Sequence, residues 1–137
     1  MIRLAELGDV PAIADLACSS SSEALAPASH DAVCLFAHEV IRNQLGIVAL
    51  REGKIIGAIG LRAQVWPQNG GRFLTDIATF GGEGVLAELI DGAREVARHK
   101  KLPLYLGAMS KDPAAVMRLY ELHGGKLVGA FYDFTPL

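Results

Sequence analysis

Cysteine and aromatic residues are scarce in this chain, and neither positive nor negative charge is in large excess. Its 137 residues include two cysteines, one tryptophan and four histidines, and the formal net charge is −2. This balance provides neither a basic face for nucleic acid nor a polybasic patch for anionic lipid, so we expect no nucleic-acid or membrane partner. Cys18 and Cys34 lack CxxC spacing and fall in expected helices, which favours buried thiols over a disulfide. The histidines are scattered, and no metal ion is expected.

Long apolar segments are also missing. The longest run, around residues 55–61, is too short to cross a bilayer, and the residues after Met1 lack the apolar stretch of a secretion signal. We therefore expect a soluble, cytoplasmic protein. Apolar residues nevertheless make up 51% of the chain, enough to bury a core without disulfides. The length is typical of one globular domain, which we expect to span residues 1–137.

Apolar residues recur with both helical and strand-like periods. Asp9 can cap a first helix that has Pro11 in its first turn. Further helices are expected over residues 33–44, 85–101 and 113–123. Strands are expected over residues 2–5, 46–50, 55–61, 73–80, 102–106 and 126–134. Residues 51–54 have the composition of a hairpin turn, and the Ser-, Ala- and Pro-rich residues 19–28 predict a mobile loop.

The segment from Arg72 to Val85 is the most informative part of the chain. A strand-like run leads into Gly81-Gly82-Glu83-Gly84 and then into a helix. Glycines let the backbone approach a phosphate, and the first N–H groups of a helix carry the positive end of its dipole. The pattern predicts an anion site for a phosphorylated cofactor. A dinucleotide fingerprint also fits residues 82–87, but it follows an antiparallel hairpin, so a nicotinamide cofactor is not expected.

In element order and motifs, the chain resembles the GNAT superfamily of N-acetyltransferases over essentially its whole length. The segment Thr79-Phe80-Gly81-Gly82-Glu83-Gly84 is similar to the family's pyrophosphate motif, (Gln/Arg)-x-x-Gly-x-(Gly/Ala), at both glycines. Leu119-Tyr120-Glu121 and Gly124 are similar to the family's late Leu-Tyr-Glu-Lys-Leu-Gly-Phe segment. The Gln or Arg at the first position of the family's pyrophosphate motif is missing, and so is the Asn that precedes its late segment. Short GNAT-like chains of tailed phages depart from these motifs in a similar way, which fits a divergent, phage- or prophage-type member.

The resemblance implies an α/β (α+β) fold, with a mainly antiparallel central sheet of six to seven strands flanked by about four helices. It implies acetyl-CoA as cosubstrate and transfer of the acetyl group, by direct attack, to an amine of a small molecule or peptide. The cofactor-binding positions that it implies are Ile77, Ala78, Thr79, Gly81, Gly82, Glu83, Gly84, Val85 and Asp112. The missing motif residues and the carboxylate of Glu83 favour an alternative, a catalytically inactive CoA-sensing or protein-binding module.

Direct attack requires a base for the amine proton and an acid for the leaving thiolate. By family position Tyr120 is the acid, although its helical spacing fits a core position equally well. Asp76 is the candidate base, because a carboxylate in an apolar strand is costly unless it is hydrogen-bonded or functional. It could instead face outward. A homodimer could form through the aromatic surface of Phe131, Tyr132 and Phe134.

Overall fold

The computed structural model describes residues 1–20, 27–81, 84–108 and 110–136. Five strands form one sheet in the order β1-β2-β3-β4-β5. The first four strands pair antiparallel with their neighbours, and the last runs parallel to β4. The strands are β1 (Ile2–Leu4), β2 (Gly46–Arg51), β3 (Lys54–Val65), β4 (Arg72–Gly81) and β5 (Leu104–Tyr105).

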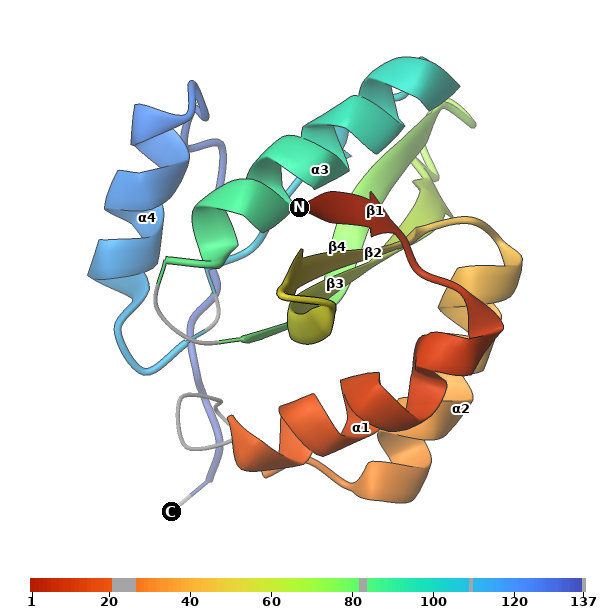
Figure 1. The fold of residues 1–137 in the computed structure, drawn as a ribbon. Coiled ribbons are helices and arrows are strands. Elements are labelled where there is room, and N and C mark those ends of the chain that lie inside the picture. Colours follow the sequence, from red (N-terminus) through yellow and green to blue (C-terminus); the bar gives the residue numbers. More distant parts are fainter. Residues whose placement is uncertain (21–26, 82–83, 109, 137) are drawn as a thin grey trace.

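Helices cover both faces of this sheet (Figure 1). They are the short 3-10 helix η1 (Leu7–Asp9), α1 (Val10–Ser19), α2 (His30–Arg42), α3 (Leu86–Lys100) and α4 (Pro113–Leu122). The pair α1 and α2 packs on one face, α3 lies across the other, and α4 stands beside α3 (Figure 1). None of the helices in the described part of the chain has the length and apolar character needed to span a membrane.

Two apolar cores follow from the alternation of side chains along the central strands. On the α3 side, Ile47, Ile59 and Leu61 pack with residues of α3 such as Leu89 and Ala93. The core on the α1/α2 side contains Val10, Ile13, Ala37, Ile41, Val48, Leu50 and Ala58. Burying both faces of β2 explains its unbroken apolar sequence.

Most of the local sequence signals have the expected structure. The β2–β3 connection is a two-residue hairpin in which Glu52 and Gly53 both have positive φ, as a type I′ turn requires. Asp112 caps α4 by accepting a hydrogen bond from the backbone N–H of Ala115, and Pro113 follows in the first turn. The last turn of α3 contains Arg98, His99 and Lys100, as the helix dipole favours.

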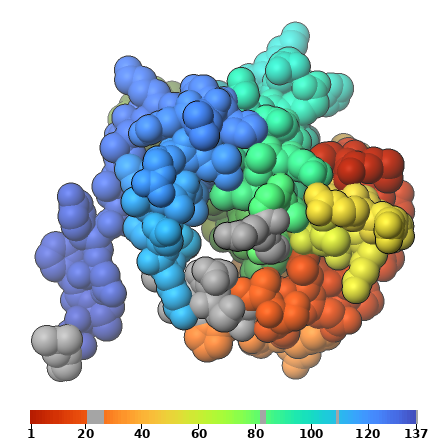
Figure 2. Space-filling model, turned by 60° about the vertical axis from the view of Figure 1, so that its left-hand side comes forward, coloured from red at the N-terminus to blue at the C-terminus, as the bar shows by residue number. Residues whose placement is uncertain are grey.

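The predicted strand over residues 126–134 is wrong, and so is the predicted count of six to seven strands. Phe131 and Phe134 are 80% and 90% exposed, and residues 123–136 belong to no helix or strand. Figure 2 shows this C-terminal segment standing apart from the body of the molecule. A strand needs a partner, and β5 is only two residues long, so it presents little edge for another strand to join.

Two smaller expectations also fail. The carboxylate of Asp9 makes no cap to α1. Its oxygens bind the Arg3 guanidinium, at 2.7 and 3.0 Å, and Oδ2 also accepts from the backbone N–H of Glu6 at the start of η1. This pair holds β1 to the start of the first helix. Cys18 is exposed and Cys34 is half-buried, so the predicted burial of both thiols is wrong. Residues 21–26 of the predicted mobile loop lie outside the described residues.

Candidate active site

The outer edge of β4 loses its partner halfway along the strand. β5 pairs with β4 at Leu74 and Thr75 alone, whereas β4 continues to Gly81. At the same point Ile77 is an extra residue in the pairing of β4 with β3, because Gly60 faces Ala78 while the next residue, Leu61, faces Asp76. Bulges of this kind redirect side chains and often lie next to active sites.

Asp76 lies at this divergence and replaces part of the missing strand pairing. Its Oδ1 accepts a hydrogen bond of 3.0 Å from the backbone N–H of Gly107, two residues after the end of β5. Burial raises the pKa of the Asp76 carboxyl above its usual range, although hydrogen bonds from Gly107, its own backbone N–H and Thr75 oppose the rise. The side chain faces inward, so the outward-facing alternative does not hold.

Tyr120 reaches the same place from the second half of α4. Its hydroxyl donates a hydrogen bond of 2.6 Å to the carbonyl oxygen of Gly107. Burial, and secondly the charge of Asp76, raise the pKa of the phenol far above its usual value. Tyr120 is half-buried and belongs to neither apolar core, so it is no ordinary core residue.

Asp76 and Tyr120 therefore converge on the two polar groups of one residue, Gly107. The site combines a carboxyl whose proton affinity is raised by burial with a phenol that stays protonated. The raised pKa of Asp76 is the direction that suits a general base, whereas the raised pKa of Tyr120 keeps its proton on the phenol. Sequence analysis missed Gly107 because its contribution is made by backbone atoms. The only signal was its place directly after a predicted strand.

The turn between β4 and α3 holds the helix close to the sheet. Gly81 has a φ of +146°, and a Cβ there would lie 3.0 Å from the carbonyl oxygen of Ile56. Val85 is 3% exposed and packs on Gly57 of β3, where a Cβ would come within 2.0 Å of its Cγ1. Gly84 also has positive φ. The predicted cofactor residues Gly82 and Glu83 lie outside the described residues.

The first turn of α3 begins after its N-cap residue, Val85, and no side chain of the described residues caps it. Glu88 places a carboxylate in this turn, but Arg51 lies 3.4 Å and the amino group of Met1 3.9 Å from that carboxylate. Two cations therefore offset the acidic side chain beside a potential anion site. Asp112, which is predicted to bind cofactor, caps α4 with its carboxylate.

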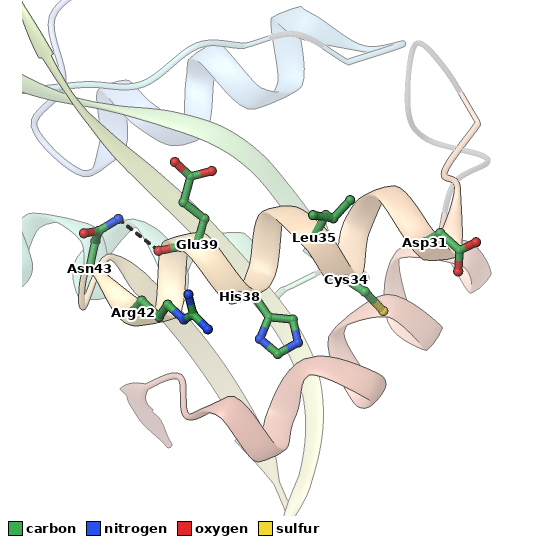
Figure 3. Close-up of a pocket in the computed structure, with 7 residues that line it drawn as sticks. All are labelled: Asp31, Cys34, Leu35, His38, Glu39, Arg42 and Asn43. Atoms are coloured by element: carbon green, nitrogen blue, oxygen red, sulfur yellow. Dashed lines mark hydrogen bonds between the residues drawn. The ribbon is translucent and has the colours of Figure 1, made fainter.

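Two hollows border α2. The first is lined only by outer residues of α2 and by Asn43, including Cys34, His38 and Arg42, as Figure 3 shows. The hydrogen bond drawn among these residues joins the Asn43 amide to the Glu39 carbonyl, at the end of the same helix. This hollow is therefore the open flank of one helix. The second lies between α2 and the sheet and reaches Ile77 and Ala78 of β4. No group of three His, Cys, Asp or Glu in the described ranges could hold a metal ion.

Comparison with solved structures identifies the architecture. A probable acetyltransferase matches 100% of this chain and 97% of its own, with a TM-score of 0.76 and 17% identity. A predicted acetyltransferase from Clostridium acetobutylicum, described with acetyl-CoA, matches 98% and 95%, with a TM-score of 0.75 and 15% identity. A ribosomal-protein-alanine N-acetyltransferase from Brucella melitensis biovar Abortus matches 98% and 96%, with a TM-score of 0.69 and 20% identity. The chain has the GNAT acetyltransferase fold.

No protein-family model and no curated protein matches the sequence. The GNAT fold nevertheless accounts for the element order, including the parallel β5 and the helix α3 that follows the glycine-rich turn. Within this fold Asp76 and Tyr120 meet at Gly107, and the backbone of Ile77, Ala78 and Thr79 lies on the part of β4 that has no β5 partner.

Proposed function

We propose that this protein is an acetyl-CoA-dependent N-acetyltransferase that moves an acetyl group to an amine by direct attack. The observation that supports it most strongly is the pairing of Asp76 and Tyr120 at Gly107, where β4 and β5 part. The fold, shared with acetyltransferases, makes acetyl-CoA the natural cosubstrate. The acceptor is an amine of a small molecule or a peptide.

The cofactor would bind along the unpaired part of β4. Backbone groups at Ile77, Ala78 and Thr79 would hold the pantetheine as an added strand, a contact that does not depend on side chains. The pyrophosphate would lie at the turn of Gly81 to Val85 and the start of α3, where Gly82 and Gly84 match the family motif. Glu83 lowers the expected affinity, because a carboxylate in a phosphate loop repels the ligand.

In the proposed reaction the amine nitrogen attacks the thioester carbon, so that a C–N bond forms and the C–S bond breaks. Asp76 accepts the proton that the amine loses, a task for which its raised pKa suits it. Tyr120 donates its proton to the leaving thiolate of CoA. Its O–H must first rotate away from the Gly107 carbonyl, to which it donates in this structure.

Thermal unfolding with acetyl-CoA, CoA and NAD tests the cofactor. A ligand that binds only the folded chain raises the melting temperature by mass action. We expect a rise with acetyl-CoA and CoA and none with NAD, and release of CoA once an amine acceptor is added. Binding without turnover of any amine would favour the CoA-sensing module. Absence of binding would favour the protein-binding module.

A further inference from the structure

The hollow between α2 and the sheet is a small apolar cavity with a volume of about 80 Å³. Every residue that lines it is apolar. Among them are Phe36, Val40 and Ile41 of α2, and Gly60, Ala78 and Phe80 of the sheet. Phe36 is 55% exposed although it lines the cavity, so the cavity wall reaches the molecular surface there.

A row of small residues creates this space. Gly46, Gly60 and Ala78 face one another across β2, β3 and β4. The side chain of Val40 lies above the two glycines, and a Cβ on Gly60 would be 3.5 Å from it, at ordinary contact distance. Neither Gly46 nor Gly60 has the positive φ that would by itself require glycine. At Gly60 the absent side chain therefore leaves room under α2, whereas a Cβ on Gly46 would lie only 3.3 Å from Ala5 Cβ and Val40 Cγ1, so Gly46 permits close packing.

The cavity adjoins the proposed active site from the opposite face of the sheet. Ala78 pairs with Gly60 and Asp76 pairs with Leu61, and successive residues of a strand point to opposite faces. Leu61 belongs to the α3-side core, so Asp76 points to that side and Ala78 to the α2 side. Both residues lie on the part of β4 that β5 does not cover.

We propose that this cavity binds a branched aliphatic group of the amine acceptor. The proposal rests on the N-acetyltransferase function. A cavity of 150 Å³ holds benzene, so 80 Å³ accommodates about three carbon atoms, the size of an isopropyl group. Its apolar lining gives a second ammonium group no partner, which excludes diamines and polyamines from this position. An acceptor whose aliphatic group fills the cavity at Ile77 and Ala78 would have to present its amine at the uncovered edge of β4, where Asp76 lies.

The test compares two acceptors that differ by one isobutyl group, leucinamide and glycinamide. Binding is measured by calorimetry, with and without saturating CoA, so that turnover is not required. From the burial of about three carbons we expect leucinamide to bind on the order of 50-fold more tightly. 3-Methylbutylamine carries the same branched group as leucinamide but lacks the carboxamide. It should bind about as tightly as leucinamide if the site takes free alkylamines, and more weakly if the site takes peptide-like acceptors.

Gly60→Ala tests the cavity itself. The added methyl group fills part of the space at ordinary contact distance, so the variant should fold, which thermal unfolding checks. We expect its affinity for leucinamide to fall about fourfold while its affinities for glycinamide and CoA stay unchanged. Gly8→Ala, with nothing within 4 Å of the new Cβ, is the matched control. The double variant Gly60→Ala/Val40→Ala should regain leucinamide binding, because it restores the space.

Three results have distinct meanings. If CoA binds but leucinamide binds no better than glycinamide, the cavity proposal is overturned and the N-acetyltransferase proposal stands. If leucinamide is preferred but neither CoA nor acetyl-CoA binds, the cavity proposal holds and the proposed function fails. If Gly60→Ala weakens isobutyryl-CoA relative to acetyl-CoA but leaves leucinamide unchanged, the cavity binds the acyl group and our assignment is overturned.

Discussion

Asp76 and Tyr120 are joined through one residue, Gly107, whose N–H donates to the carboxylate and whose carbonyl accepts from the phenol. Asp76 lies in β4, and Tyr120 lies in α4, 44 positions later in the chain. Gly107 lies where β5 has already left β4, so the two hydrogen bonds hold the diverging chain in place. The same contacts that hold the diverging chain thus bring the proposed base and the proposed acid together.

Replacement of Tyr120 by phenylalanine removes the proposed acid and keeps the ring. We expect kcat to fall by about 10²- to 10⁴-fold, the usual contribution of a positioned general acid, with little change in the KM for acetyl-CoA. Loss of the hydrogen bond to Gly107 should also lower stability by about 1 kcal/mol. Tyr105→Phe is the matched control, because Tyr105 packs against Trp66 and Phe73 through its ring. Undiminished turnover in Tyr120→Phe would remove Tyr120 as the acid.

Asp76→Asn keeps an oxygen that can accept from Gly107 but removes the charge. We expect turnover to fall by about 10²- to 10⁴-fold and the acidic limb of the pH–rate profile to disappear. Asp31→Asn, an exposed position on α2, is the control. An unaltered pH–rate profile would show that another group is the base.

The same variant should change how stability depends on pH. Because burial raises the pKa of Asp76, the folded chain binds this proton more tightly than the unfolded chain does. The resulting stabilisation is fully present below the unfolded pKa and is lost as pH rises through the folded pKa. We therefore expect Asp76→Asn to gain stability relative to the parent protein as pH rises through this range. Thermal unfolding in a pH series measures the difference.

Asp9 should show the opposite dependence. Its hydrogen bonds to Arg3 lower the pKa of the carboxyl, so its stabilisation is present above the unfolded pKa and is lost as pH falls through the folded pKa. We expect Asp9→Asn to lower stability by about 1 kcal/mol at neutral pH and by less in acid. Glu121→Gln, on the exposed end of α4, controls for loss of a carboxylate. An equal loss of stability at both pH values would contradict the ion-pair explanation.

Gly57→Ala tests the contact that fixes the start of α3. The new Cβ would lie 2.0 Å from Val85 Cγ1, so the helix must move or the strand must bend. We expect a loss of about 1–3 kcal/mol in stability, as in other overpacked cores, and weaker CoA binding. The double variant Gly57→Ala/Val85→Ala should be more stable than the sum of the single changes predicts, since it removes the clash. Simple additivity in urea unfolding would contradict this account.

Much of the local structure could be predicted from the sequence because its causes are local. Positive φ at Glu52 and Gly53 makes the hairpin, and Asp112 with Pro113 starts α4 as expected. The strand predicted over residues 126–134 failed because an alternating pattern does not supply a partner strand. Asp9 failed as a cap for a similar reason, since Arg3, brought near it by the fold, takes both carboxylate oxygens.

For the candidate site, the residues themselves pointed to Asp76 in its apolar strand and to a glycine-rich turn, and the resemblance to the GNAT superfamily pointed to Tyr120. They left open whether Asp76 faces inward and whether Tyr120 belongs to the core, because both depend on which faces of β4 and α4 are covered. The bulge at Ile77 and the early end of β5 settle the direction of Asp76 and place Gly107 between the two side chains. Local conformation followed from neighbouring residues, whereas burial, pKa shifts and the cavity under α2 arise only when distant segments pack together.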